Sequence, residues 1–208
     1  MVTLHHLNNS RSQRILWLLE ELGIPYEVKR YQRDAQTRLA PPELKAIHPL
    51  GKSPVVTDGD AVVAESGAIV EYLIDTYGQG RLRPAEGSNA MVPYRHWLHF
   101  AEGSAMLPLM LALYTSRLGD AAAPLAPRIS SEIANHLAYL DGALATGPFL
   151  LGDELTGADI QVSFVVEAAA ARGLLAQYPN LARYGAAIQA RPAYQRALEV
   201  GGPYELGR

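Results

Sequence analysis

Cysteine is the residue that this chain of 208 amino acids lacks entirely. Its absence excludes disulfide bridges, thiolate metal ligands and a cysteine nucleophile. Charge of one sign is also scarce, because 18 basic and 21 acidic side chains leave a net charge of −3 at pH 7. A nucleic-acid-binding protein usually carries a basic face. We therefore expect neither a mixed disulfide with the protein nor a nucleic-acid partner.

Two longer sequence features are missing as well. No apolar run is long enough to span a bilayer. The N-terminal stretch MVTLHHLNN lacks the basic start and the apolar core of a signal peptide. We therefore expect a cytoplasmic protein with no membrane partner. The apolar content of 49% is sufficient for the core of one large domain or two small ones.

The first half of the N-terminal region alternates between strand and helix patterns. Residues 2–7 read as a short strand, and apolar residues from 11 to 22 recur at helical spacing until Gly23 ends the helix. Residues 26–31 indicate a second strand. Residues 41–49 form at most a short helix between prolines.

A hairpin and a helix complete this region. Two valine-rich runs flank Asp58-Gly59, which predicts a hairpin that turns at these two residues. Another helical face begins at Ser66 and ends at Gly78. The order βαβ, short helix, ββα is typical of an α/β thioredoxin-like domain, which we place at residues 1–80.

The rest of the chain is helical in pattern. Residues 81–88 are rich in glycine, proline and charge and predict a linker, so an all-helical domain should occupy 89–208. We expect a long helix over 89–117, bent near Pro108. A second helix should cover 124–146, and two shorter ones should be divided at Pro192.

The segment 156–173 is nearly apolar, so it should be the buried centre of the helical domain. Thr156 and Asp159 form a variant of the capping box at its start, which favours helix nucleation there.

The histidines do not predict a metal site. His5 and His6 are neighbours in a strand, so their side chains point to opposite faces. His96 and His99 lie three apart on a helix, but Glu102 is the only carboxylate nearby. We therefore expect no bound metal.

The stretch Asn8-Asn9-Ser10 stands where the first helix begins. Ser10 and Gln13 have the spacing of a capping box, in which the serine bonds a backbone N–H and the glutamine reaches back. A helix N-terminus with an adjacent hydroxyl is also suited to hold an anion. The spacing alone leaves both interpretations open.

Four segments resemble the cytosolic glutathione S-transferase family, in particular its serine-type bacterial and fungal branch. They are NNSRSQRILWLLEELGIPYE at the first strand–helix junction, HPLGKSPVV at 48–56, ES at 65–66 and LTGADIQVSF at 155–164. They follow one another in the family's order and cover nearly the whole chain. The resemblance implies a thioredoxin-like domain that binds glutathione, an all-helical domain, and a homodimer.

The resemblance also implies how the thiol of glutathione is activated. Ser10 lies four residues before Arg14, the spacing between activating serine and helix arginine in the serine-type classes. Asn9 is the alternative, because its amide can also donate to sulfur. Ser12 is a weaker third candidate and could instead cap the helix.

The remaining glutathione contacts follow from the same resemblance. Pro54 should be cis and should direct the backbone of Val55 towards the cysteinyl part of the tripeptide. Ser66, which is also a plausible N-cap, should hold the γ-glutamyl carboxylate, and Glu65 should meet the amine. Lys52 either pairs with the glycyl carboxylate or is a solvated loop lysine.

The acceptor pocket should be lined by the long helix over 89–117. His99, Glu102, Met106 and Tyr114 are candidates, although each could equally face the core or a partner subunit. The expected function is conjugation of glutathione to small hydrophobic electrophiles, with peroxide reduction as a related activity of the same thiolate. The alternative is a non-catalytic glutathione-binding or scaffold module, because a fold does not determine a function.

Overall fold

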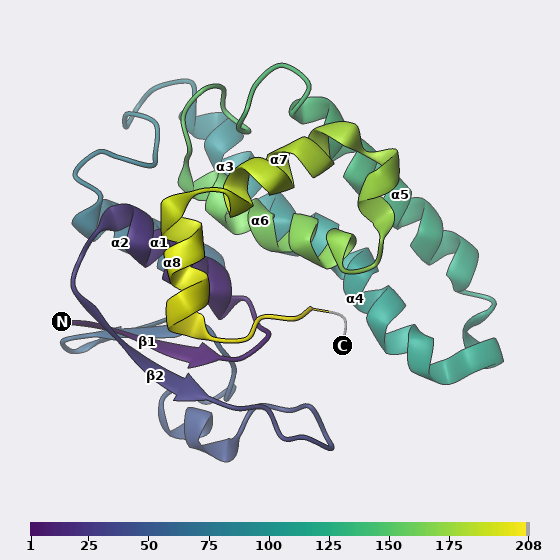
Figure 1. Ribbon diagram of the computed structural model, residues 1–208, viewed down its shortest axis with the longest axis horizontal. Helices are drawn as coiled ribbons and strands as arrows, with labels where there is room; N and C mark the ends of the chain where they lie inside the picture. Colours follow the sequence, from purple (N-terminus) through teal and green to yellow (C-terminus); the bar gives the residue numbers. More distant parts are fainter. Residues whose placement is uncertain (207–208) are drawn as a thin grey trace.

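A computed structural model describes residues 1–206 of the chain, which folds into an α/β part followed by a helical part (Figure 1). The α/β part contains one four-stranded sheet with the order β2-β1-β3-β4. Strand β1 pairs in parallel with β2 and antiparallel with β3. This is the predicted thioredoxin-like arrangement. The strands are β1 (Val2–Leu7), β2 (Tyr26–Tyr31), β3 (Val55–Asp58) and β4 (Ala61–Ala64).

The β3–β4 hairpin is present, but its turn is shifted by one residue from the prediction. Asp58 pairs with Ala61 in the ladder, so the turn residues are Gly59 and Asp60. Gly59 has a φ of 56°, a conformation that glycine adopts without a steric penalty. Asp58 is held in the strand because its carboxylate accepts hydrogen bonds from the hydroxyls of Tyr72 and Tyr77.

The expected α-helices form with bounds within a few residues of the predicted ones, except that the single helix expected over 89–117 is divided in two. They are α1 (Ser12–Leu22), α2 (Ser66–Tyr77), α3 (Met91–Phe100), α4 (Met106–Thr115), α5 (Ala126–Ala143), α6 (Gly157–Ala170), α7 (Pro179–Gln189) and α8 (Pro192–Gly201). Short 3₁₀ turns cover Pro42–Ala46, Ser116–Ala122 and Leu174–Gln177. No described helix is both long and apolar enough to cross a bilayer.

The long helix predicted over 89–117 is interrupted earlier than expected. A π-helical turn, Ala101–Ala105, separates α3 from α4, and Pro108 lies inside α4. Proline lacks an N–H, and its ring crowds the carbonyl four residues before it. The wide turn ends directly before α4 and rearranges the carbonyls that Pro108 would otherwise meet. The helix predicted over 89–117 is therefore divided at Ala101–Ala105, before Pro108.

Helix α6 is the centre of the helical part, as predicted. Eleven of its fourteen residues are buried. Asp159 accepts a hydrogen bond from the backbone N–H of Thr156, which confirms the capping box, and another from that of Leu150 at 2.9 Å. Burial raises the pKa of Asp159, although these hydrogen bonds oppose that shift.

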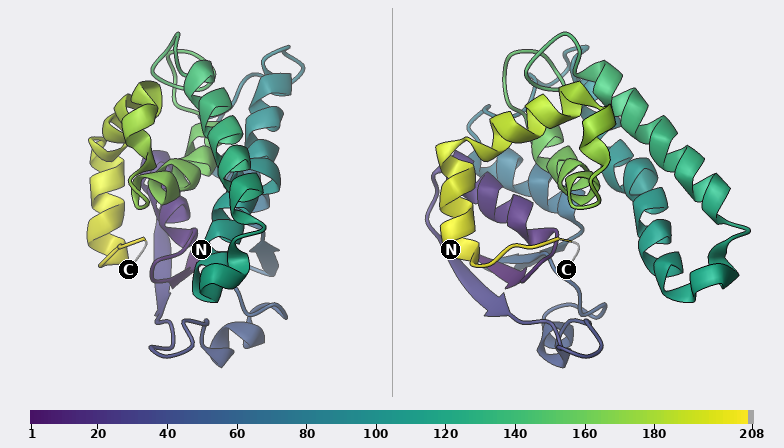
Figure 2. Two further views of the ribbon diagram at one scale, coloured as in Figure 1. Left: turned by 90° about the vertical axis from the view of Figure 1, so that its right-hand side faces the viewer. Right: turned by 45° about the vertical axis from the view of Figure 1, so that its right-hand side comes forward.

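Helix α1 connects the two parts. It packs against β1 and α2 of the α/β part and against α6 and α8 of the helical part. One apolar core runs through both parts. Figure 2 shows α4 and α5 extending from this core as an arm. The segment after α8 returns to the β1–α1 turn, where the N–H of Glu205 donates to Oδ1 of Asn9 at 2.7 Å.

Candidate functional site

The turn between β1 and α1 is held in one conformation by a neighbouring arginine. Asn9 has a φ of 50°, which asparagine tolerates better than most residues. The guanidinium of Arg33 donates to the carbonyls of Asn8 and Asn9, and the Arg33 N–H donates to Oδ1 of Asn8 at 2.9 Å. The turn therefore presents Ser10 at a fixed place before the positive end of α1.

Ser10 does not form the capping box. Its side chain is 5% exposed and donates to the carbonyl of Leu7 at 2.8 Å. Its oxygen accepts from the N–H of Ser12 at 3.2 Å, and α1 has no side-chain cap at Arg11. The amide of Gln13 is buried instead of reaching back, and it has no hydrogen-bond partner within residues 1–206. The capping-box interpretation is thus wrong.

The side chain of Asn9 is oriented by the C-terminal segment. Its Oδ1 accepts a hydrogen bond from the backbone N–H of Glu205, so its amide nitrogen points away from Glu205. Asn9 therefore stays beside Ser10 as a possible donor to an anion.

The loop before β3 is tied to the end of β1. The Ser53–Pro54 bond is cis, in agreement with what the resemblance implied. The hydroxyl of Ser53 donates to the carbonyl of His5 at 2.7 Å and accepts from the N–H of Leu7 at 3.2 Å. The loop therefore lies against the strand that leads into the Ser10 turn.

The expected backbone contact from Val55 needs correction. Val55 is aligned with His5 on one side and with Ala64 on the other. The backbone N–H and C=O of a strand residue point to the same side, so both groups of Val55 form their hydrogen bonds with one of these two neighbours. Ser53 is the better candidate, because its N–H and C=O form no backbone hydrogen bond within the described residues.

Ser66 lies at the start of α2 but is its first helical residue rather than its N-cap, so that prediction is wrong. Its oxygen accepts from Nη2 of Arg14 and from Nε2 of Gln161, the latter at 3.2 Å. A hydroxyl has two lone pairs and one proton. Because both lone pairs are occupied, Ser66 is left with a proton to donate to an incoming acceptor.

Glu65 precedes Ser66 with an exposed side chain and a φ of 69°. A positive φ is unfavourable for a glutamate, and such conformations cluster at functional sites. Lys52, which lies two residues before the cis proline, is also exposed and forms no ion pair within the part of the chain described.

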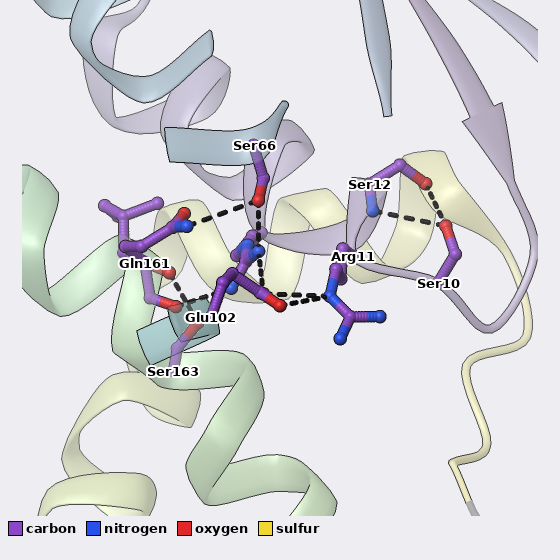
Figure 3. Close-up of polar contacts among 9 residues, drawn as sticks. Ser10, Arg11, Ser12, Ser66, Glu102, Gln161 and Ser163 are labelled. Carbon is purple, nitrogen blue, oxygen red and sulfur yellow. Dashed lines mark hydrogen bonds and ion pairs between the residues drawn. The ribbon is translucent and has the colours of Figure 1, made fainter. Parts of the chain in front are cut away.

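A charged network links α1 to the helical part (Figure 3). Arg14 is 1% exposed and donates to Glu102 at 2.6 Å and to the carbonyl of Gln161 at 2.5 Å. Nε of Arg11 donates to both oxygens of Glu102, at 2.8 and 2.9 Å. Both guanidiniums stack over the ring of Phe164, at 4.9 and 5.5 Å from its centre.

The network determines the charge states of its members. Burial lowers the pKa of Arg14, and Glu102 opposes this shift. Burial alone would raise the pKa of Glu102, but Arg14 and Arg11 together hold it below its ordinary value. Glu102 is therefore an ionised carboxylate paired with two arginines, and it is not available to line the acceptor pocket.

The four predicted pocket residues do not share one environment. Met106 packs in the core, so its assignment to the pocket is wrong. Tyr114 is 63% exposed on the arm, and His99 is exposed on α3. Sequence reasoning missed Gln161, Arg11 and the structural role of Arg14. A single glutamine inside the nearly apolar α6 was the signal that could have identified the first of these.

Comparisons with known proteins agree with this geometry. A sequence model of the glutathione S-transferase N-terminal domain matches residues 1–75, and one of the C-terminal domain matches residues 123–187. Glutathione S-transferase 3 of Schizosaccharomyces pombe is 38% identical over 217 residues, which cover 96% of this chain and 87% of that protein.

Solved structures resemble the whole chain. A crystal structure of a glutathione S-transferase from Actinobacillus pleuropneumoniae superposes with a TM-score of 0.89 at 39% identity, covering 97% of this chain and 93% of that one. A glutathione transferase family member from Pseudomonas fluorescens, solved with two glutathione bound, has a TM-score of 0.82 at 28% identity, covering 95% of this chain and 92% of that one.

Proposed function

Because this chain belongs to the glutathione S-transferase family, we propose that it conjugates glutathione to small hydrophobic electrophiles. The thiol loses its proton, the thiolate attacks an electrophilic carbon, and the leaving group departs with its bonding electrons. One observation carries the proposal: Ser10, Ser53 and Ser66 are all hydrogen-bonded to the frame made by β1 and α1. These hydrogen bonds support three proposed binding positions for one tripeptide, which they hold relative to one another.

The γ-glutamyl end of glutathione is proposed to bind at the N-terminus of α2. Ser66 has a proton to donate, and the helix terminus favours a carboxylate. Glu65 is exposed beside it, where its negative charge suits the ammonium group of the same residue. Lys52 is proposed to meet the glycyl carboxylate at the other end.

The cysteinyl part is proposed to bind like an added strand at the loop before β3. The N–H and C=O of Ser53 are the groups available for this, whereas those of Val55 lie within the sheet. An added strand in this position would lead the thiol towards the turn that contains Ser10.

Thiol activation requires a modest interaction energy. A free cysteine thiol has a pKa of about 8.5, and lowering it by one unit needs about 1.4 kcal/mol. A hydrogen bond to a charged group contributes roughly 1.5–3 kcal/mol. One hydroxyl or amide donor at the positive end of α1 therefore suffices to lower the thiol pKa by one to two units. Ser10 is the proposed donor, and Asn9 is the alternative.

Catalysis is tested by measuring glutathione binding by calorimetry and conjugation of an aromatic halide on one preparation. We expect binding together with a rate well above the reaction in buffer, and Ser66→Ala should weaken binding. Binding without turnover would favour the non-catalytic module. The same thiolate would attack a peroxide oxygen, so hydroperoxide reduction is assayed in parallel.

A homodimer and a cytoplasmic location are also proposed. Apolar side chains are exposed on both parts of the chain, including Leu50, Val62, Val92 and Leu107. Pairing of the α/β part of one subunit with α3 and α4 of its partner would cover them. Sedimentation at micromolar concentration tests this, and a monomer would contradict it. The cytoplasm is the compartment that glutathione keeps reducing.

A further inference from the structure

Three polar side chains at the turn between β1 and α1 are linked by a continuous series of hydrogen bonds. His6 in β1, Ser12 in α1 and Ser10 are all at most 5% exposed. Nδ1 of His6 is 2.9 Å from Oγ of Ser12, which is 2.8 Å from Oγ of Ser10. Figure 3 shows the Ser10–Ser12 contact. Buried polar groups are costly unless they are hydrogen-bonded, so each proton in this chain needs an acceptor.

The neighbouring groups determine where those protons point. Burial lowers the pKa of His6 to about 4, so the imidazole is neutral at physiological pH. The Gly201 backbone accepts a hydrogen bond from the ring, and Nε2 is the nitrogen near Gly201. Nε2 then carries the proton and Nδ1 is an acceptor, a tautomer assigned from these partners. Ser12 accordingly donates to His6.

Ser10 is consequently left with two inward acceptors for its one proton, the carbonyl of Leu7 at 2.8 Å and Oγ of Ser12 at 2.8 Å. In this arrangement the proton points away from the site where a sulfur would bind. To stabilise a thiolate, Ser10 must turn its proton outwards. The carbonyl of Leu7 then needs another donor, and Ser12 is within reach of it at 3.2 Å.

We propose that His6 and Ser12 are positioning residues that let Ser10 turn its proton towards the thiolate, through a change of tautomer at His6. With its proton on Nδ1, His6 donates to Ser12, and Ser12 is free to donate to Leu7 or to Ser10. Nε2 becomes an acceptor near Gly201, which the buried side chain of Gln13, without a partner within residues 1–206, also approaches. This inference rests on the proposed function, because the thiolate is what draws the proton outwards.

The proton count closes. The Ser12 proton passes to Nδ1 of His6, the Ser10 proton passes to Ser12, and the thiol proton passes to Ser10, which then donates it to the thiolate. Nε2 releases its proton to solvent, so the imidazole stays neutral and one proton leaves for each thiolate formed. Histidine is suited to this position because each of its ring nitrogens can be donor or acceptor. His5 offers an internal control. It lies on the opposite face of β1, and its Nδ1 is 2.9 Å from the Tyr31 hydroxyl. His5 is therefore not part of the hydrogen-bonded series His6–Ser12–Ser10.

The direct test is ¹⁵N NMR of the histidine rings in the full protein, free, with glutathione, and with S-methyl glutathione, which cannot form a thiolate. We expect His6 to carry its proton on Nε2 in the free protein and on Nδ1 with glutathione, while S-methyl glutathione and the His5 signals show no change. The same samples give the thiol pKa from the thiolate absorbance. An unchanged His6 tautomer together with a lowered thiol pKa would overturn this inference alone. A thiol pKa that is not lowered would overturn the proposed function as well.

A pair of serine variants gives an independent readout. Ser12→Ala should raise the thiol pKa of bound glutathione, and a rise of one unit lowers kcat/KM about tenfold at a pH below that pKa. KM for glutathione should change by less than about twofold, because Ser12 is not placed against the tripeptide. Ser163→Ala is the matched control, since its buried hydroxyl donates only to the carbonyl of Ile160 in its own helix. An unchanged thiol pKa in Ser12→Ala would refute the positioning role.

Discussion

Replacing Glu102 by glutamine should destabilise the protein through the cation that is left behind. Glu102→Gln keeps the shape of the side chain but removes the charge that compensates Arg14, which is 1% exposed. Breaking a buried ion pair by removing one partner costs roughly 3–5 kcal/mol. Because Glu102 is 30% exposed, we expect the lower end, about 3 kcal/mol. For a chain of this length, that lowers Tm by roughly 6–12 °C.

Thermal and urea unfolding of Glu102→Gln and Arg11→Ala measure this effect. Arg11 is the matched control, because it contacts the same carboxylate with a 28% exposed side chain and leaves the Arg14 pair intact. We expect Arg11→Ala to cost about 1 kcal/mol or less. Equal losses in both variants, or no loss in Glu102→Gln, would refute the argument from buried charge.

The pH dependence of the same variant has a defined sign. The folded pKa of Glu102 lies below its ordinary value of 4.5, so its ionised form stabilises the fold above that value. This contribution is lost as the pH falls through the folded pKa. The difference between wild type and Glu102→Gln should therefore be constant near neutral pH and narrow below about pH 4.5. A difference that widens in acid would contradict the assigned charge states.

Three further predictions concern single positions. The pKa of His6 drops from 6.5 to about 4 on folding, so stability should fall as the pH is lowered from 6.5 to 4, by roughly 3 kcal/mol in total, and urea unfolding of His6→Gln should lack this component. Glu65→Gly relieves the backbone strain at a φ of 69°, so the free energy of unfolding from thermal unfolding should rise by about 1 kcal/mol, while calorimetry should show weaker glutathione binding. A variant with the stability and the glutathione affinity of the wild type would argue against a strained binding residue at this position. Gly157→Ala would place Cβ 2.6 Å from Cδ1 of Ile74 and 2.7 Å from the hydroxyl of Tyr94, so it should lose about 1–3 kcal/mol in urea unfolding, and a neutral effect would show that α2 and α3 can move apart.

The elements of the fold were predictable because local patterns and tertiary packing agree. The apolar face of α1, the valine runs of β3 and β4 and the capping box at Thr156 each have one interpretation that the packing also satisfies. Two local details were not predictable. The turn after Asp58 depends on tyrosines from α2, and the π-helical turn before Pro108 depends on how α3 and α4 pack. Both are decided by contacts distant in sequence.

A residue of the candidate site was predictable only where a short local segment of the sequence indicates it. Ser10, Pro54 and Ser66 lie in segments that resemble the family's, and the cis bond at Pro54 was implied by that resemblance alone. The direction of a hydroxyl proton or a backbone carbonyl is not marked in this way. The spacing at Ser10 therefore left a capping box open, and Val55 rather than Ser53 was expected as the backbone contact. Arg14 and Glu102 are 88 residues apart, so their ion pair leaves no local signal.

The measurement that tests the central claim most directly is a titration of the thiolate absorbance of glutathione bound to wild type, Ser10→Ala and Asn9→Ala. The account predicts a thiol pKa about one to two units below 8.5 in the wild type. It predicts that Ser10→Ala reverses most of this shift and lowers the conjugation rate, whereas Asn9→Ala has a smaller effect. A Ser10→Ala protein that keeps both the low thiol pKa and the wild-type rate would contradict the assignment of Ser10 as the thiol activator.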